Sequence, residues 1–225
     1  MEKSLEKLLC EINWEMSGPE IEAESFRRIE EGLTGWRRQV PDEIFKIGRR
    51  LVHTTADFSL VNDLVWHNDP VAAGLSALKE HAPIYCDATM IRSGLSEARL
   101  KSVNPDYSKD DICCLVADPE VAAAAARRGQ ARSLVALEKA EAVIDGGIVL
   151  IGNAPLALAG IIRLHAEKGI RPRLVIGLPV GFVHVVESKE LLMATDIPHL
   201  VIRGRRGGSS LAVATLHAII ESFAG

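Results

Sequence analysis

The chain has 225 residues, with 26 Lys and Arg against 30 Asp and Glu, a net charge of −4 and 48% hydrophobic residues. This composition supplies the core of one large domain, and it lacks the positive charge expected of a nucleic-acid-binding protein. Aromatic residues make up only 4% of the chain, so few side chains are available to stack on bases. We therefore expect a single domain over residues 1–225 that binds no nucleic acid.

The sequence also argues against export and membrane insertion. The N-terminus carries acidic residues where a secretory signal needs a basic region followed by an apolar block. The longest apolar stretch, residues 148–162, is interrupted by glycine, asparagine and proline and is shorter than the roughly 20 residues that span a bilayer. The cysteines show neither a CxxC spacing nor paired histidine ligands, and they are Cys10, Cys86, Cys113 and Cys114. We expect a cytoplasmic protein with reduced thiols and no metal site.

The first third of the chain has the spacing of amphipathic helices. Apolar residues recur at i, i+3, i+4 and i+7 over residues 1–16, at Leu5, Leu8, Leu9 and Ile12. We expect a helix there, within an N-terminal helical extension over residues 1–18. Similar patterns predict helices over residues 19–33 and 41–56, each with a proline suited to a first turn. The opening third is therefore expected to be entirely helical.

Beyond this region, short apolar runs alternate with helical stretches. The runs cover residues 83–86, 112–116, 148–151, 174–176 and 200–202, and the helical stretches lie near 88–101, 119–143, 154–168, 187–195 and 208–223. Strands joined by helices of this length form right-handed crossovers and a parallel sheet that is covered on both faces. The pattern predicts an α/β fold, a three-layer α/β/α sandwich with a five-stranded, mainly parallel sheet.

The turns after the last three strands are IGNAP, GLPVGFV and RGRRGGS. In parallel-sheet proteins, ligands bind beyond the carboxyl ends of the strands. The glycines allow close backbone approach, and Arg203, Arg205 and Arg206 favour an anionic ligand at the start of the last helix. A tight strand-to-helix turn explains GNAP equally well, whereas the arginines exceed what a turn requires. We expect these turns to lie at the binding site.

His53 is the principal candidate for proton transfer. Helical spacing places Arg50, His53, Thr54 and Asp57 on one polar face, and imidazole is the side chain that titrates nearest neutrality. A histidine with helical neighbours is nevertheless more often structural. The remaining histidines share no HxxxH or HxH spacing, and the chain contains no GxSxG elbow, GxGxxG fingerprint or P-loop. Metal-dependent, serine-hydrolase, dinucleotide and ATP chemistry are therefore disfavoured.

Nine sequence motifs together resemble one enzyme family. They are IEAESF (21–26), RRLVHTTADF (49–58), DATMIRSG (87–94), DPEVAAAA (118–125), ARSLVAL (131–137), GNAPLAL (152–158), GLPVGFV (177–183), ESK (187–189) and RGRRGGS (203–209). In this order, over roughly residues 21–216, the chain resembles the precorrin-8X methylmutases of cobalamin biosynthesis, in particular the cobalt-precorrin-8 methylmutases.

The resemblance implies a flavodoxin-like parallel sheet, a homodimer, and no metal or organic cofactor. It also implies a reaction in which (cobalt-)precorrin-8, a tetrapyrrole that carries many carboxylates, is rearranged to (cobalt-)hydrogenobyrinate or cobyrinate. A methyl group migrates from ring carbon C-11 to C-12 by a sigmatropic shift. That reaction needs no nucleophile, but a proton donor that draws electron density from the ring lowers its barrier. His53 matches the family's proton-transferring histidine.

The resemblance also carries over substrate-binding positions. Ser25 and Arg50 match residues that contact the substrate in the family, and Thr89 and Arg132 are further candidates. Arginine suits a ligand with acetate and propionate arms because it forms bidentate hydrogen bonds to carboxylates. The sequence departs from the family pattern at residues 184–186, where bulky residues replace small ones, so an altered pocket wall is expected. HTTADF resembles the cobalt-dependent branch and points to a cobalt-bearing substrate.

Another class of function fits the same features. A non-catalytic corrinoid or tetrapyrrole carrier would use the same turns for an anionic ligand and would return that ligand unchanged. A generic nucleotide-binding protein is a third possibility, which would bind ATP or NAD and no corrinoid.

Overall fold

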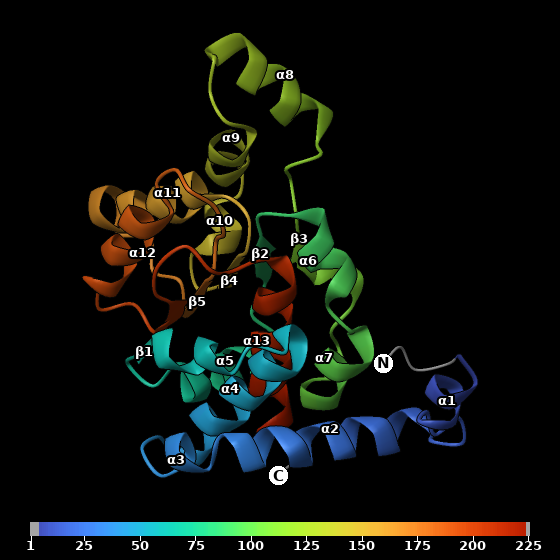
Figure 1. The fold of residues 1–225 in the computed structure, drawn as a ribbon. Coiled ribbons are helices and arrows are strands. Elements are labelled where there is room, and N and C mark those ends of the chain that lie inside the picture. The colour runs from blue at the N-terminus through green and yellow to red at the C-terminus, as the bar shows by residue number, and fades with distance from the viewer. Residues whose placement is uncertain (1–4, 224–225) are drawn as a thin grey trace.

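The computed structural model describes residues 5–223, which form a central sheet with helices on both faces (Figure 1). The strands are β1 (Leu64–His67), β2 (Ile84–Cys86), β3 (Ile112–Cys113), β4 (Ile148–Ile151), β5 (Leu174–Gly177) and β6 (His199–Ile202). Their order in the sheet is β1-β6-β5-β4-β2-β3. All neighbours are parallel except β1 and β6, which pair antiparallel.

The five parallel strands confirm the flavodoxin-like prediction, because β2 to β6 follow the 2-1-3-4-5 order of that fold. The predicted strand number was wrong, since the sheet has a sixth strand, β1. β1 also contradicts the expectation that the opening third is entirely helical. It is as long as β4, β5 and β6, and its place comes from antiparallel pairing along β6, with Leu64 opposite Ile202, a contact that local periodicity does not reveal.

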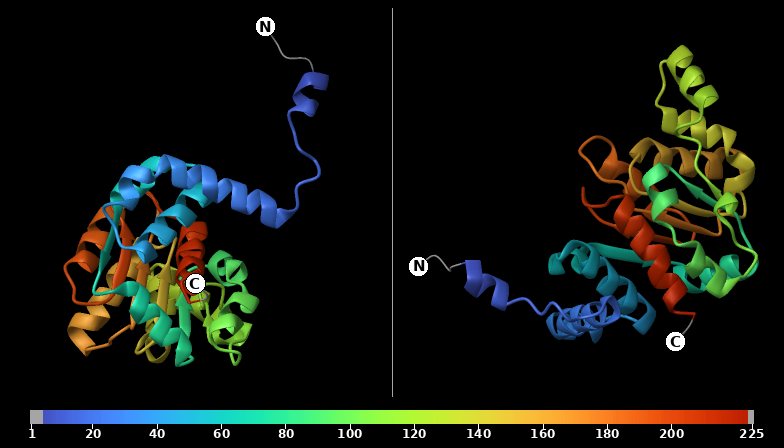
Figure 2. Two further views of the ribbon diagram at one scale, coloured as in Figure 1. Left: turned by 90° about the horizontal axis from the view of Figure 1, so that it is seen from below. Right: turned by 90° about the vertical axis from the view of Figure 1, so that its right-hand side faces the viewer.

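The N-terminal helices are α1 (Leu5–Cys10), α2 (Gly18–Gly32), α3 (Thr34–Arg37) and α4 (Asp42–Thr55). The helix expected over residues 1–16 ends at Cys10, because the Asn13 side chain accepts a hydrogen bond from the Glu15 N–H and stabilises a turn. Residues 1–4 lie outside the described part of the chain. Ser17 and Glu20 form a capping box that starts α2. Figure 2 shows α1 held away from the rest of the molecule by the extended segment before α2.

The stretch expected to be one helix over residues 119–143 is divided into α8 (Pro119–Arg128), α9 (Arg132–Lys139) and α10 (Glu141–Ile144). Gly129 ends α8 in the left-handed conformation at φ 61°, a conformation that favours glycine. α8 projects from the body (Figure 1) and packs on α9 around a small apolar core, whereas Leu137 of α9 belongs to the core that contains α11. The stretch 88–101 is likewise divided into α6 (Thr89–Gly94) and α7 (Glu97–Val103), because Ser96 caps a new helix.

Three of the remaining helices lie close to their predicted positions, and they are α11 (Pro155–Lys168), α12 (Val185–Met193) and α13 (Ser209–Glu221). The helix α5 (Pro70–Lys79) and the short 3₁₀ helices η1 (Phe58–Asp63) and η2 (Lys109–Asp111) were not predicted. Within residues 5–223, no helix combines the length and the apolar character needed to cross a bilayer.

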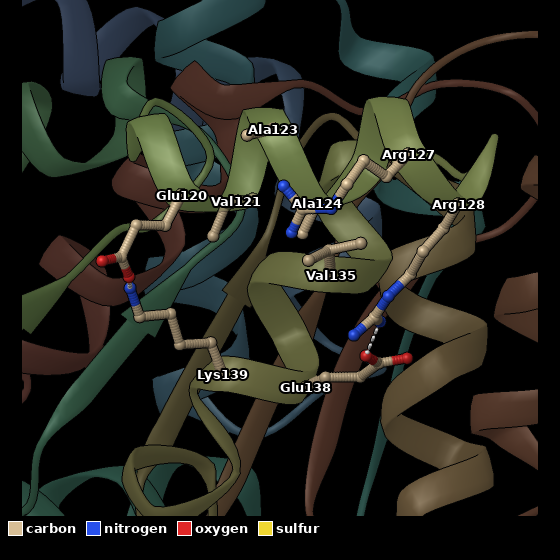
Figure 3. A pocket seen from close by; sticks show the side chains of 9 residues that line it. All are labelled: Glu120, Val121, Ala123, Ala124, Arg127, Arg128, Val135, Glu138 and Lys139. Carbon is tan, nitrogen blue, oxygen red and sulfur yellow. Dashed lines mark hydrogen bonds and ion pairs between the residues drawn. The ribbon is translucent and has the colours of Figure 1, made fainter.

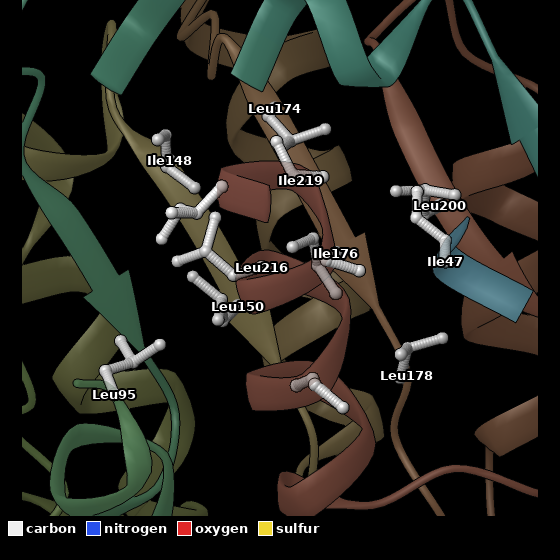
Figure 4. Close-up of a cluster of buried hydrophobic side chains, with 14 of the residues drawn as sticks. Ile47, Leu95, Ile148, Leu150, Leu174, Ile176, Leu178, Leu200, Leu216 and Ile219 are labelled. Carbon is white, nitrogen blue, oxygen red and sulfur yellow. The ribbon is translucent and has the colours of Figure 1, made fainter. Parts of the chain in front are cut away.

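The predicted three layers are confirmed by two apolar cores on opposite faces of the sheet. Alternate residues of the strands, such as Ile148, Leu150 and Ile176, contribute to the core that also contains α13 residues Leu216 and Ile219 (Figure 4). The intervening strand residues belong to the second core with side chains of α10, α11 and α12. This packing fixes the strand ends, and hence the turns that follow them.

Candidate active site

The turns after β4, β5 and β6 pack against one another at the carboxyl edge of the sheet. Leu178 donates its N–H to the Ile151 carbonyl at 2.8 Å, and Gly208 donates its N–H to the Leu178 carbonyl at 2.8 Å. A Cβ on Gly207 would lie 2.2 Å from the Leu178 oxygen, so only glycine permits this approach. The three turns that the sequence singled out therefore lie together, and their role as a binding site stays a prediction.

Asp87 fixes the turn that follows β4. Its carboxylate accepts hydrogen bonds from the N–H groups of Gly152, Asn153 and Ala154, at 2.9, 2.9 and 2.5 Å. The side chain is buried between β2 and β4, where the strand order reverses. Burial raises the pKa of Asp87, and the three N–H donors oppose that rise. The sequence placed Asp87 in a motif but gave no sign of this bracing role.

Lys189 and Arg206 hold the turn that follows β6. Lys189 is only 1% exposed, and its ammonium donates to the carbonyls of Gly204 and Arg206 at 2.9 and 2.6 Å. Burial lowers the pKa of Lys189 to about 8. The Arg206 guanidinium forms ion pairs with Asp57, at 2.5 Å, and with Asp63. Arg206 is therefore committed to bracing η1, which leaves Arg203 and Arg205 as the exposed arginines of this turn.

The turn that follows β5 presents an exposed apolar surface. Phe182 is 87% exposed, Val180 and Val183 are also exposed, and the Arg205 guanidinium lies 5.9 Å from the Phe182 ring centre. Met90, at the start of α6 beyond β2, is exposed as well. A broad apolar surface rimmed by arginine suits a flat ligand with anionic groups.

The bulky residues at 184–186 were expected to alter a pocket wall. In the structure, Val185 is buried and points into the protein, Val186 is half-buried, and His184 is exposed as the residue that precedes α12.

His53 lies in the last turn of α4 and is oriented by Ser25 of α2. The Nδ1 atom of His53 is 2.9 Å from the Ser25 hydroxyl oxygen, and the Phe26 ring meets the imidazole edge-on at 5.1 Å between ring centres. The imidazole is half-buried beside a hollow of about 210 Å³, which is lined by Ser25, Arg28, Ile29, Val52, His53, Ala56 and Phe58. Two of the predicted site residues, 28 positions apart in the sequence, are thus brought together.

The predicted partnership of His53 with Asp57 is wrong. α4 ends at Thr55, and Ala56 takes a left-handed conformation with φ 55°, so the chain turns away before Asp57. The Asp57 carboxylate instead accepts a hydrogen bond from the Ser59 N–H at 2.9 Å and pairs with Arg206. The prediction assumed that the helix continues to residue 57, but the left-handed Ala56 ends it.

Arg50 lines a second hollow, on another side of α4. Its guanidinium forms ion pairs with Glu22, at 2.9 Å, and with Glu221, and its Nε is buried without a partner. These pairs join α2, α4 and α13. The hollow has a volume of about 370 Å³ and is lined by Arg50, Thr54, Met90, Gly94, Ser210, Val213, Ala214 and His217.

His217 is a residue of this second hollow that the sequence did not single out, because no motif includes it. The imidazole Nε2 accepts a hydrogen bond from the Ser96 N–H at 3.1 Å. Burial, with Arg99 and Arg50 nearby, lowers the pKa of His217 to about 4. The side chain is therefore neutral at pH 7 and holds the start of α7 against α13.

The other two predicted binding residues each begin a helix other than α4. Thr89 is the exposed first residue of α6, and Arg132 is the exposed first residue of α9. Figure 1 shows α9 at the opposite end of the molecule from α4. The structure therefore does not bring Arg132 and His53 together within one chain.

A hollow of about 640 Å³ lies between α8 and α9 (Figure 3). Four of the five charged residues that line it pair with one another, Lys139 with Glu120 at 2.6 Å and Arg128 with Glu138 at 2.6 Å. This hollow therefore offers a weaker candidate for anion binding than the carboxyl edge. Among residues 5–223, no cluster of three or more histidine, cysteine or acidic side chains is arranged to hold a metal ion.

Comparison with known proteins agrees with this geometry. Residues 20–222 match the family model described as precorrin-8X methylmutase. The chain is 37% identical to a cobalt-precorrin-8 methylmutase of Leptospira interrogans, over 90% of this chain and 93% of that protein. It is 36% identical to a precorrin-8X methylmutase of Pseudomonas aeruginosa, over 92% and 97%.

A solved structure, the precorrin-8X methylmutase of Thermus thermophilus, superposes with a TM-score of 0.80 at 38% identity and covers 91% of this chain and 95% of that one. Both the sequence and the fold are thus shared along nearly the whole length. The resemblance first seen in the sequence motifs is confirmed, and the chain belongs to the precorrin-8X methylmutase family, a family of isomerases.

Proposed function

We propose that the protein moves a methyl group from C-11 to C-12 of (cobalt-)precorrin-8 and yields (cobalt-)hydrogenobyrinate or cobyrinate in cobalamin biosynthesis. Membership of the methylmutase family supports the reaction class. The observation that carries the proposal for this chain is the pairing of Ser25 and His53 beside a hollow at the end of α4.

In the proposed mechanism, His53 transfers a proton to the macrocycle. The Ser25 hydroxyl oxygen accepts a hydrogen bond from the Nδ1–H group and fixes the imidazole plane. Proton exchange is then left to Nε2, the other ring nitrogen. Protonation draws electron density from the tetrapyrrole and lowers the barrier to migration, and it requires no nucleophile.

Binding of the macrocycle is assigned to the carboxyl edge of the sheet. The exposed apolar groups of Phe182, Val183 and Met90 offer contacts for the flat ring, and Arg205 lies at their rim. Carboxylate arms would find further donors in Ser25, Arg50, Thr89 and Arg132. The ring needs such contacts because carboxylates alone do not orient a flat macrocycle.

Arg132 supports a homodimer. Arg132 begins α9, which lies at the other end of the molecule from α4 and packs against the projecting α8 (Figure 1). We infer that α8 and the start of α9 reach the substrate of a second subunit. Subunits carrying His53→Ala and subunits carrying Arg132→Ala should each be impaired. Dissociated and reassociated as a mixture, they should recover about a quarter of wild-type activity, because each mixed dimer restores one intact site. A mixture no more active than its parents would contradict the shared site.

The experiment that tests the reaction uses purified protein and precorrin-8 or its cobalt form. Wild-type protein should change the absorption spectrum, and the isolated product should show the migrated methyl group. His53→Ala should keep tetrapyrrole binding and lose turnover roughly 100-fold or more. The carrier alternative predicts that even wild-type protein returns the ligand unchanged. Full turnover by His53→Ala would overturn the proposed role of His53.

A further inference from the structure

Two cysteine thiols lie side by side at the ends of neighbouring strands. β2 and β3 are parallel, and their register places Ile84 opposite Ile112 and Tyr85 opposite Cys113. Continuing that register places Cys86 opposite Cys114, the first residue after β3. Facing residues on adjacent strands are separated by about 4.8 Å between backbones, within the Cα separation of about 4.4–6.8 Å found for disulfides.

The alternation of side chains puts these two thiols on the same face of the sheet. Cys86 belongs to the core on the α13 face, and Cys114 packs against that same core. Cys113 packs against the core on the opposite face. Each of the two thiols shifts the pKa of the other, as expected of neighbouring groups, and the Cys86 thiol donates to the Ala88 carbonyl at 3.6 Å. Cys113 therefore lies on the opposite face of the sheet and is excluded as a disulfide partner of Cys86.

The surroundings give the two thiols different chemical roles. β3 is the outer strand of the sheet, and Cys114 is half-buried beyond its end, where it is reachable by a small reagent and free of the β-ladder. The Cys86 thiol partner and the Val116 N–H lower the pKa of Cys114 to about 7, despite the opposing effect of burial. Cys86 is buried and has its pKa raised by its interaction with Cys114 and by burial. Cys114 is thus the thiol that reacts first.

We propose that Cys86 and Cys114 form a reversible disulfide when the protein meets a hydroperoxide. The Cys114 thiolate attacks the peroxide oxygen, which breaks the O–O bond and leaves a sulfenic acid and, after protonation, water or an alcohol. The Cys86 thiol then attacks the sulfenic sulfur, the S–S bond forms, and water leaves. Two thiols are oxidised by two electrons, and the peroxide is reduced.

The bond would join two segments that serve the candidate site. Cys86 immediately precedes Asp87, whose carboxylate fixes the turn after β4. Cys114 opens the segment that leads into the projecting α8. Oxidation would therefore fasten the base of the α8–α9 pair to the strand that positions Asp87.

The test treats the folded, fully reduced protein with hydrogen peroxide, blocks the remaining thiols and maps tryptic peptides without reduction. Trypsin releases Cys86 in one peptide and Cys113 together with Cys114 in another. The proposal predicts a disulfide-linked pair of these two peptides, with a mass two hydrogen atoms below the sum of the two peptide masses. Dithiothreitol should separate the pair. Fragmentation of the pair should place the bond at Cys114.

Cys113→Ser is the matched control, because it changes the adjacent thiol on the opposite face. The cross-link should persist in Cys113→Ser and disappear in Cys114→Ser. A bond within the second peptide, between Cys113 and Cys114, would overturn the proposal. Persistence of all native thiols after peroxide treatment, in a wild-type protein shown to be folded by circular dichroism, would overturn it as well.

Discussion

Asp87→Asn should destabilise the protein strongly, because the carboxylate is the acceptor for three backbone N–H groups at one turn. The amide keeps one oxygen and replaces the other by a donor, so one or two of the three N–H groups lose their acceptor. Each buried N–H without a partner costs about 1–3 kcal/mol. The free energy of unfolding should therefore fall by about 2–4 kcal/mol.

Urea unfolding followed by circular dichroism measures this change as a lower midpoint at an unchanged m value. Asp69→Asn is the matched control. Asp69 caps α5 from an exposed position by accepting from the Ala72 N–H, and asparagine caps helices as well as aspartate does. The control should lie within about 0.5 kcal/mol of wild type. An Asp87→Asn protein as stable as the control would refute the bracing role.

Three further predictions concern stability and catalysis. Gly207→Ala places a Cβ 2.2 Å from a backbone oxygen and should lower the free energy of unfolding by about 2–4 kcal/mol. Gly204→Ala, at φ 73° with open space around it, should cost only about 1 kcal/mol, and equal losses in urea unfolding would contradict this account. His217 binds its proton more weakly in the folded protein than in the unfolded chain. Its contribution is therefore present above pH 6.5 and is lost as pH falls toward about 4. His217→Gln should remove about 2–3 kcal/mol of the stability difference between pH 7 and pH 4.5, and an unchanged pH profile would exclude the effect. Ser25→Ala should lower kcat about ten- to a hundredfold, because it misorients His53, and should also raise KM, because Ser25 is a proposed substrate contact; an unchanged kcat would contradict the orienting role.

The parallel part of the fold was predictable because each strand is a continuous apolar run and each crossover has helical length. β1 was missed although it is as long as β4, because its antiparallel pairing with β6 is decided by contacts between segments far apart in sequence. Gly129 ends α8 within the stretch 119–143, where the spacing of apolar residues continues as in a single helix.

Site residues were predictable where a sequence motif contains them. They were not predictable where the packing of distant segments decides which groups a side chain contacts. The pairing of Ser25 with His53 joins two motifs that the sequence had already marked. Asp57 was assigned to the wrong cluster, because the left-handed Ala56 turns the chain toward Arg206. The bracing by Asp87 and Lys189 depends on which backbone groups lie nearby, information that only the folded chain contains.

The central claim is that this chain catalyses methyl migration through His53 at the edge of its parallel sheet. The most direct measurement incubates wild-type and His53→Ala protein with precorrin-8 or its cobalt form and determines the methyl pattern of the recovered tetrapyrrole by NMR. Wild-type protein should move the methyl group from C-11 to C-12, whereas His53→Ala should leave the substrate bound and unchanged. Unchanged substrate from the wild-type protein, or full conversion by the variant, would contradict the central claim.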